Sequence, residues 1–193
     1  MLTIEHLNCG YGKHEILHDI SVTIPDKKIT AIVGQSGCGK TTFLKMISGL
    51  SKPTDGEIQM FGYRNEELKN VRSRISCLIE APGIYGNMSA YHNLAIKCRL
   101  FGINDSKYIE NILKIVGLSE VGKKKTKHFS LGMKQRLGIG LALVGEPDLL
   151  VLDEPINGLD PQGIAEIRDM LLRLKEEQNM TIIISSHILE ELS

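Results

Sequence analysis

Apolar and polar residues alternate along three short segments of the chain. The alternation covers Leu2–Leu7, Ile20–Ile24 and Glu57–Phe61, and a period of two residues predicts strands with one buried face. The turn-forming residues Lys52–Gly56 come directly before the third segment. Because turns of this kind join neighbouring strands, we expect the three segments to form an antiparallel sheet that begins at the N-terminus.

Nearly continuous apolar runs predict a second group of strands. Ile29–Val33 is rich in β-branched residues, and Ile75–Ile79, Asp148–Leu152 and Thr181–Ser185 are almost wholly apolar. Runs of this length are typical of strands that are covered on both faces, as in the parallel sheets of α/β proteins. We therefore expect the last three of these strands to be buried.

Helical periodicity occupies much of the remaining sequence. Ser89 and Ser130 are predicted N-caps, and glycines mark several helix ends. The predicted helices cover residues 40–48, 90–101, 107–116, 131–144 and 161–178. Residues 84–144 are thus expected to form a helical region that is inserted between strands of the core.

The loop after the strand 29–33 carries the most specific motif. Its residues Gly34-Gln35-Ser36-Gly37-Cys38-Gly39-Lys40-Thr41-Thr42 match G-x-x-x-x-G-K-[ST] at every fixed position. The glycines let backbone N–H groups surround an anion, and the N-terminus of the following helix adds positive potential. The motif predicts a nucleotide site in which Lys40 contacts the β- and γ-phosphates and Thr41 binds Mg²⁺. A glycine-rich turn without a ligand is the alternative.

Polar residues also follow two of the buried strands. Asp153 and Glu154 come after the strand 148–152, and His187 follows the strand that ends at Ser185. Ligands of open α/β sheets bind at the carboxyl ends of strands, so these residues should converge with Lys40 and Thr41. Asp153 would hold Mg²⁺ through water, Glu154 would polarise an attacking water, and His187 would contact the γ-phosphate. The alternatives are that Asp153 and Glu154 only form a turn at the end of the strand and that His187 is a surface residue without a ligand.

Composition argues against a membrane-spanning or secreted protein and against a general attraction to nucleic acid. The 193 residues contain 23 Lys and Arg against 23 Asp and Glu, and this balance gives no general attraction to nucleic acid or to an anionic membrane. No apolar run approaches the roughly 20 residues of a membrane span, and the N-terminus lacks a secretory signal. We expect one cytosolic domain.

Tyr11 and Cys38 leave two functional questions open. Tyr11 lies between two glycines, where it either stacks on an adenine ring or packs in the core. Cys38 is either a reactive thiol beside the P-loop lysine or a small residue that fills the loop. Cys9, Cys77 and Cys98 lack the C-x-x-C spacing that would indicate zinc.

Six motifs, in this order, resemble the ATP-binding cassette of ABC transporters. They are Tyr11, GQSGCGKTT at 34–42, FSLGMKQR at 129–136, LLVLDEP at 149–155, NGLDP at 157–161 and SSH at 185–187. The resemblance extends over essentially the whole chain. It implies an α/β P-loop NTPase with a RecA-like, mainly parallel core sheet, an N-terminal antiparallel β subdomain and an inserted α-helical subdomain. Residues 1–83 and 145–193 would form the core with its β subdomain, and residues 84–144 the helical subdomain.

The resemblance also implies roles and partners. Glu154 would be the general base of ATP hydrolysis, His187 the switch histidine, and Tyr11 the residue that stacks on adenine. Ser130 and Gly132 would belong to a signature that binds the γ-phosphate of ATP held by a second subunit. Asp160 would lie in a loop that communicates across this head-to-tail dimer. The implied complex includes transmembrane permease subunits at the inner face of the cell membrane, and no nucleic acid.

The chain departs from the family pattern at three points. The signature Phe129–Met133 lacks the first Gly and the Gln of Leu-Ser-Gly-Gly-Gln, and Glu80 replaces a Gln that senses Mg²⁺ and faces the membrane subunit. As an acid beside the metal and nucleotide, Glu80 is expected to change the coupling of hydrolysis to transport. The third departure is the end at Ser193, before a further helix and strands, which indicates a truncated or abbreviated cassette.

Glu80 and the Ser-Leu-Gly-Met-Lys-Gln-Arg signature together resemble the ATPase subunits of lantibiotic and bacitracin self-protection exporters. Two other functions stay open at this point. One is a cassette ATPase that acts on ribosomes or DNA, against which the single P-loop and the lack of heptads argue. The other is a module that binds ATP without turnover, against which Glu154 argues.

Overall fold

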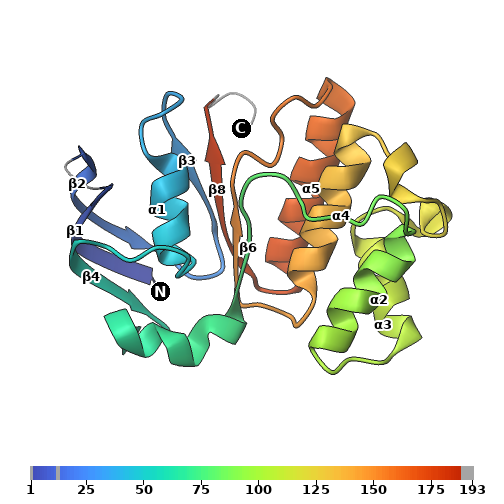
Figure 1. The fold of residues 1–193 in the computed structure, drawn as a ribbon, viewed down its shortest axis with the longest axis horizontal. Coiled ribbons are helices and arrows are strands. Elements are labelled where there is room, and N and C mark those ends of the chain that lie inside the picture. Colours follow the sequence, from blue (N-terminus) through green and yellow to red (C-terminus); the bar gives the residue numbers. More distant parts are fainter. Residues whose placement is uncertain (1, 12–13, 188–193) are drawn as a thin grey trace.

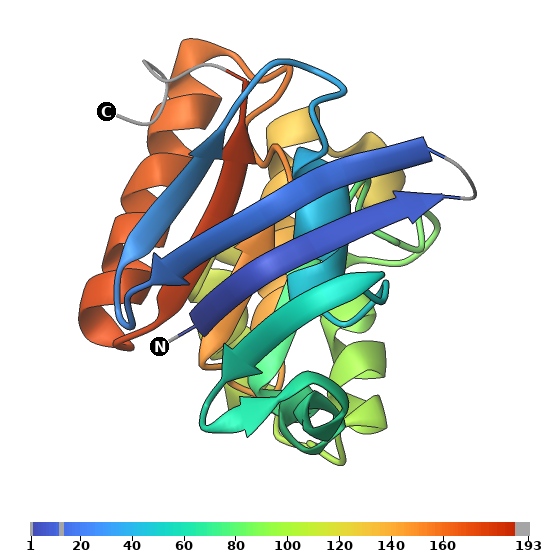
Figure 2. The same cartoon turned by 90° about the vertical axis from the view of Figure 1, so that its left-hand side faces the viewer.

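Two sheets and one helix between them build the half of the molecule that carries the P-loop. The computed structural model describes residues 2–11 and 14–187, without the side chains of Tyr11 and His14. Figure 1 shows α1 (Lys40–Ile47) between the antiparallel strands on the left and the parallel strands at the centre. Figure 2 shows the antiparallel strands crossing in front of α1. The layers therefore follow the order sheet, helix, sheet.

The antiparallel sheet contains four strands in the order β2-β1-β4-β5. They are β1 (Leu2–Tyr11), β2 (His14–Ile24), β4 (Asp55–Met60) and β5 (Tyr63–Arg64). The sheet confirms the predicted pairing, and β1 and β2 form one long hairpin whose paired residues extend to Tyr11 and His14. Bulges in this hairpin interrupt the alternation of apolar residues, which is why the sequence pattern underestimated both strands.

The parallel sheet has the order β3-β8-β7-β6. Its strands are β3 (Ile29–Val33), β8 (Thr181–Ser186), β7 (Leu149–Leu152) and β6 (Ile75–Leu78). The central strands β7 and β8 are buried throughout, as expected. The prediction that 75–79 is a fully buried strand was wrong, because β6 lies at an edge and most of its residues are only half-buried.

Alternate residues of β7 contribute to two separate cores. Leu149 and Val151 face α1 and the antiparallel sheet, where Leu44 and Ile47 are fully buried. The intervening residues of β7 pack in a second core with the helices on the other side of the sheet. Burial of a strand on both faces explains why its sequence is apolar at every position rather than at every second one.

The second core is covered by four helices. They are α2 (Ala90–Leu100), α3 (Ser106–Ile115), α4 (Leu131–Leu143) and α5 (Pro161–Glu177). Ser89 caps α2 and Ser130 caps α4 through their hydroxyl oxygens, which confirms both predicted N-caps. Figure 1 shows α2, α3 and α4 grouped at the end of the molecule away from the antiparallel sheet.

Short 3₁₀ segments were not predicted. The longest, Asn65–Arg74, leads from the antiparallel sheet to β6, and two others span Ser119–Val121 and Thr126–His128. Val71 is the buried residue of the first segment, so this segment has no apolar periodicity that sequence analysis could detect. Within residues 2–11 and 14–187, no helix has the length and apolar character needed to cross a membrane.

Candidate functional site

The glycine-rich segment 34–39, here called the P-loop, links β3 to α1. Gly37 and Gly39 adopt left-handed backbone conformations, with φ of 81° and 96°. A Cβ atom at Gly39 would lie 2.8 Å from Leu17 Cδ2 on the antiparallel sheet. Glycine is therefore required at this position both by the backbone conformation and by the close approach of β2.

Lys40 is the buried cation of the site. Only 7% of its surface is exposed, and its Nζ atom donates to the carbonyl oxygens of Gly34 at 2.7 Å and Gln35 at 3.1 Å. The same Nζ lies 3.6 Å from Glu154 Oε1. A buried ammonium needs such partners; here two are carbonyl oxygens of the glycine loop and the third is a carboxylate oxygen after β7.

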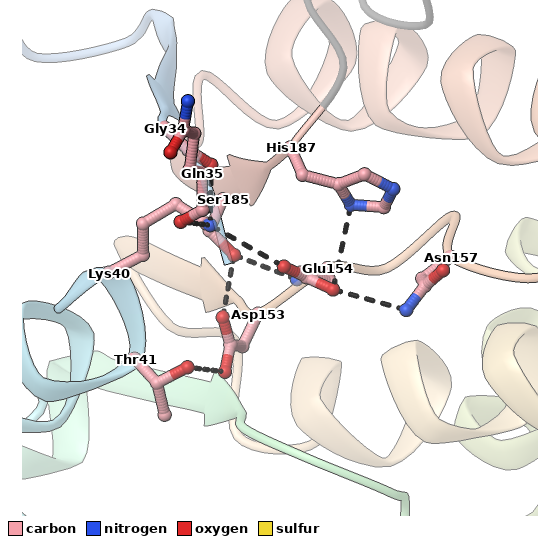
Figure 3. Close-up of polar contacts among 9 residues, drawn as sticks. All are labelled: Gly34, Gln35, Lys40, Thr41, Asp153, Glu154, Asn157, Ser185 and His187. Atoms are coloured by element: carbon pink, nitrogen blue, oxygen red, sulfur yellow. Dashed lines mark hydrogen bonds and ion pairs between the residues drawn. The ribbon is translucent and has the colours of Figure 1, made fainter. Parts of the chain in front are cut away.

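Thr41 and Asp153 connect the P-loop helix to the end of β7. Thr41 Oγ1 donates to Asp153 Oδ2 at 2.7 Å, as Figure 3 shows. A hydroxyl beside a carboxylate supplies the oxygen ligands that Mg²⁺ prefers, with further positions left for phosphate and water. Among the described residues, no three His, Cys, Asp or Glu side chains gather as a metal site. The Thr41 hydroxyl and the Asp153 carboxylate supply oxygen atoms of the kind that bind a magnesium ion.

Glu154 lies at the centre of the cluster in Figure 3. Its Oε2 atom accepts a hydrogen bond from Asn157 Nδ2 at 3.1 Å and is 3.7 Å from His187 Nδ1. The residue has φ 45°, so the chain turns sharply where β7 ends. The structure thus brings together Lys40, Thr41, Asp153, Glu154 and His187, the five residues that the strand ends were expected to unite.

A cavity of about 650 Å³ adjoins this cluster. The P-loop, the segment Glu80–Pro82, the carboxylates after β7 and residues of α4 line it. Glu80 has its carboxylate 2.9 Å from Lys45 Nζ. The acid expected to add negative charge beside a metal is therefore compensated by a lysine of α1.

Ser130 of the predicted signature and Asp160 of the loop 157–160 each cap a helix. Ser130 Oγ accepts from Met133 N at 3.2 Å, and Asp160 Oδ1 accepts from Gly163 N at 3.0 Å. A Cβ at Gly132 would lie 3.7 Å from Leu159 Cδ2, so the start of α4 approaches this loop. The stacking role expected for the Tyr11 side chain lies outside the described residues.

Two residues of the cluster were missed as site residues in the sequence. Asn157 contacts Glu154, and Ser185 bonds to both carboxylate residues after β7. Ser185 is the first residue of the SSH motif and lies near the end of a buried strand, but the sequence did not indicate which residues its hydroxyl contacts. Asn157 is the first residue of the NGLDP motif, but the sequence did not indicate its contact with Glu154.

Comparison with known proteins identifies the family. The ABC transporter family model matches residues 17–157. The bacitracin transport ATP-binding protein BcrA of Enterococcus faecalis is 44% identical over the whole chain, which spans 63% of that relative. The lantibiotic transport ATP-binding protein SrtF of Streptococcus pyogenes is 44% identical over 99% of the chain and 82% of the relative. The chain thus covers less than two thirds of the bacitracin relative.

Solved structures give the same result. The cbiO1 protein of Clostridium perfringens, part of the ABC transporter complex cbiONQ, is 31% identical with a TM-score of 0.87 over 97% of this chain and 78% of that one. A dimeric ATP-binding cassette in a post-hydrolysis state, bound to ADP and Pi, has a TM-score of 0.85 at 24% identity, over 100% of this chain and 90% of that one, and supports the fold. The P-loop, the paired acids after β7 and these matches together show that the chain belongs to the ABC transporter family.

Proposed function

We propose that the chain binds and hydrolyses ATP with Mg²⁺ and thereby powers a membrane transporter. The observation that carries the proposal is the continuous set of contacts from Thr41 through Asp153 to Glu154, Lys40 and His187 at the carboxyl edge of the parallel sheet. Enzymes of this fold class bind ligands at that edge. The adjoining cavity of about 650 Å³ supplies space for a nucleotide.

In this proposal the P-loop holds the phosphates. Lys40 exchanges its contacts with the loop carbonyls for the β- and γ-phosphates, and the N–H groups around Gly37 and Gly39 surround the anion. Thr41 and Asp153 would hold Mg²⁺, which supplies charge neutralisation to the phosphates. Tyr11 stacks on the adenine.

Glu154 acts as the general base. Its carboxylate polarises a water whose oxygen attacks the γ-phosphorus while the bond to the bridging oxygen breaks, giving ADP and inorganic phosphate. The proton that the water loses passes to Glu154. Asn157 and His187 flank the same carboxylate, and His187 would contact the γ-phosphate and sense its presence.

A second ATP-binding subunit completes the site. Ser130 is exposed at the N-terminus of the 13-residue helix α4, and a helix N-terminus favours an anion. Ser130 and Gly132 would bind the γ-phosphate held by the partner in a head-to-tail dimer, with Asp160 near the dimer interface. The two subunits would then enclose two ATP molecules.

The dimer is proposed to act on transmembrane permease subunits at the inner face of the cell membrane. The names of the bacitracin and lantibiotic relatives support export of an antimicrobial peptide, or immunity to one. Residues 84–144, which include α2, α3 and α4, would be the helical subdomain. Residues 1–83 and 145–193 would be the nucleotide-binding core with its antiparallel β subdomain.

Light scattering and steady-state hydrolysis of ATP test the proposal together. The wild-type chain should release phosphate from Mg-ATP. Glu154→Gln should lower that rate by about 100-fold or more, since a general base contributes 10²- to 10⁴-fold, and should accumulate as an ATP-bound dimer. The proposal would be contradicted if both the wild type and Glu154→Gln stay monomeric, bind no nucleotide and release no phosphate.

A further inference from the structure

Ser185 lies beneath the two acids that follow β7. It is the fifth residue of β8, next to β7 in the sheet, and none of its surface is exposed. Its Oγ atom donates to Asp153 Oδ1 at 2.6 Å and accepts from the backbone N–H of Glu154 at 2.8 Å. Figure 3 shows the hydroxyl between these two residues.

Both bonds require a hydroxyl group. An ionised carboxylate only accepts hydrogen bonds and a backbone N–H only donates them, so the bridging group has to do both at once. Alanine or valine at this position would leave the N–H of Glu154 and one oxygen of Asp153 without this partner. The burial of Ser185 makes replacement by bulk water difficult.

The bridge fixes the orientation of Asp153. One carboxylate oxygen accepts from Thr41 of α1 and the other from Ser185 of β8, so the plane of the carboxylate is held from two sides. The backbone N–H of Asp153 donates to Leu78 O at 2.9 Å. The residue that would hold Mg²⁺ is therefore held both through its backbone and through each oxygen.

The bridge also fixes the backbone of Glu154. This residue has φ 45°, a conformation that non-glycine residues seldom adopt without supporting contacts. The hydrogen bond from its N–H to Ser185 supports the turn. With the turn in place, the Glu154 carboxylate lies 3.6 Å from Lys40 and 3.7 Å from His187.

We propose that Ser185 is a positioning residue for ATP hydrolysis, which sets the orientation of the Mg²⁺-binding acid and of the general base through one hydroxyl. The inference rests on the proposed function of the site. Ser185 acts through Asp153 and Glu154 and does not itself contact the nucleotide. Its loss should therefore lower turnover much more than it lowers the affinity for ATP.

Thr181 offers a matched control on the same strand. It lies four residues before Ser185 on the same face of β8, is 8% exposed, and accepts a hydrogen bond from Lys27 N at 2.9 Å. Thr181→Val thus removes a buried hydroxyl from the opposite end of β8. Any effect that reflects only the lost stability of the strand should appear in both variants.

The experiment measures kcat, KM and the thermal midpoint for wild type, Ser185→Ala, Ser185→Thr and Thr181→Val. In Ser185→Ala, kcat should fall about tenfold or more with KM changed less than about threefold, because misplaced groups lose transition-state contacts first. Ser185→Thr retains the hydroxyl and should recover most of kcat. Thr181→Val should keep kcat within about twofold of wild type.

A binding assay without turnover gives an independent readout. We expect Ser185→Ala to raise the Mg²⁺ concentration for half-maximal binding of a fluorescent, non-hydrolysable ATP analogue by about threefold to tenfold, while Thr181→Val leaves it unchanged. The inference would be overturned if Ser185→Ala and wild type have equal kcat. It would also be overturned if kcat falls in both Ser185→Ala and Thr181→Val in proportion to the loss of thermal stability. An inert wild-type protein would instead overturn the proposed function.

Discussion

Lys45 Nζ lies 2.9 Å from Glu80 Oε1, and this ion pair joins α1 to the loop after β6. Glu80 lines the cavity beside the P-loop and has φ 66°. Lys45 follows Thr41 by one helical turn, so the lysine that compensates Glu80 belongs to the same helix as the P-loop lysine. The negative charge of Glu80 beside the cavity is therefore paired with the positive charge of Lys45 on α1.

The first prediction concerns this charge balance. Lys45→Met should weaken binding of Mg-ATP about threefold to tenfold, because the carboxylate of Glu80 would then act on the phosphates without compensation. Glu80→Gln in the same background should restore the affinity. The free energy of unfolding should change by less than about 1 kcal/mol, since the Glu80 side chain of this pair is 70% exposed. Calorimetric titration with Mg-ATP of the wild type, the two single variants and the double variant measures the coupling between Lys45 and Glu80. Additive effects of the two substitutions on the affinity would contradict the prediction.

A second prediction concerns coupling to the proposed permease. Glu80→Gln in the assembled transporter should change the ratio of transport to ATP hydrolysis about fivefold, because coupling free energies of this kind are typically 1–3 kcal/mol. Vesicles that contain the complete complex allow both rates to be measured on one preparation. Unchanged hydrolysis and transport would show that the acid at this position has no role in coupling.

The third prediction concerns Asp153. Both Thr41 and Ser185 donate to its carboxylate, and the amide of Asp153→Asn can accept from only one side in the same geometry. The variant should lose about 1 to 2 kcal/mol of unfolding free energy in the absence of nucleotide. Urea unfolding with and without excess EDTA measures this loss. A stability equal to wild type would mean that the two donors find other acceptors.

The fourth prediction concerns the P-loop thiol. Cys38 is exposed, whereas Cys9 and Cys98 are buried and burial raises the pKa of Cys77. Cys38 should therefore react first with a coloured disulfide reagent, and Mg-ATP should slow this phase about tenfold by ordering and covering the loop. Cys38→Ser should remove the fast phase. If Mg-ATP does not change the rate of the fast phase, the result would argue against ATP binding at this loop.

The fifth prediction concerns pH and the bulge of the first hairpin. His6 Nδ1 lies 2.6 Å from Asp19 Oδ1, and the hydrogen bond and charge of Asp19 raise the pKa of His6. Because the pKa is higher in the folded protein, the pair stabilises the fold below the ordinary histidine pKa, and this contribution disappears as pH rises through the raised value. Neighbouring Glu5 and Asp55 act in the same direction.

Asp19→Asn should accordingly destabilise the protein more at about pH 5.5 than at about pH 8. Urea unfolding of both proteins at the two pH values measures the difference. Glu15→Gln, which removes the partner of the exposed His18, serves as the matched control on the same strand. An equal loss in Asp19→Asn at both pH values would exclude a contribution from His6 protonation.

Local patterns predicted the helices well because caps and periodicity are encoded within a few residues. Ser89 and Ser130 begin helices as expected. The length of the first hairpin was harder to predict from the sequence, because His6 and Asp19 adopt left-handed conformations in bulges that interrupt the alternation of apolar and polar residues. Bulges depend on contacts across the hairpin, such as the Asn8 side chain accepting from Asp19 N. The sequence of one strand alone does not indicate these contacts.

The sequence by itself determined the P-loop, the acids after an apolar strand and the helix caps, because each depends on neighbouring residues and a fixed spacing. Only the tertiary structure decided which strands are central and which hydroxyl bridges Asp153 to Glu154. Strand order depends on packing between segments far apart in the chain, and Ser185 meets Glu154 across 31 residues. Hydrogen bonds of that range arise only once β7 and β8 pair.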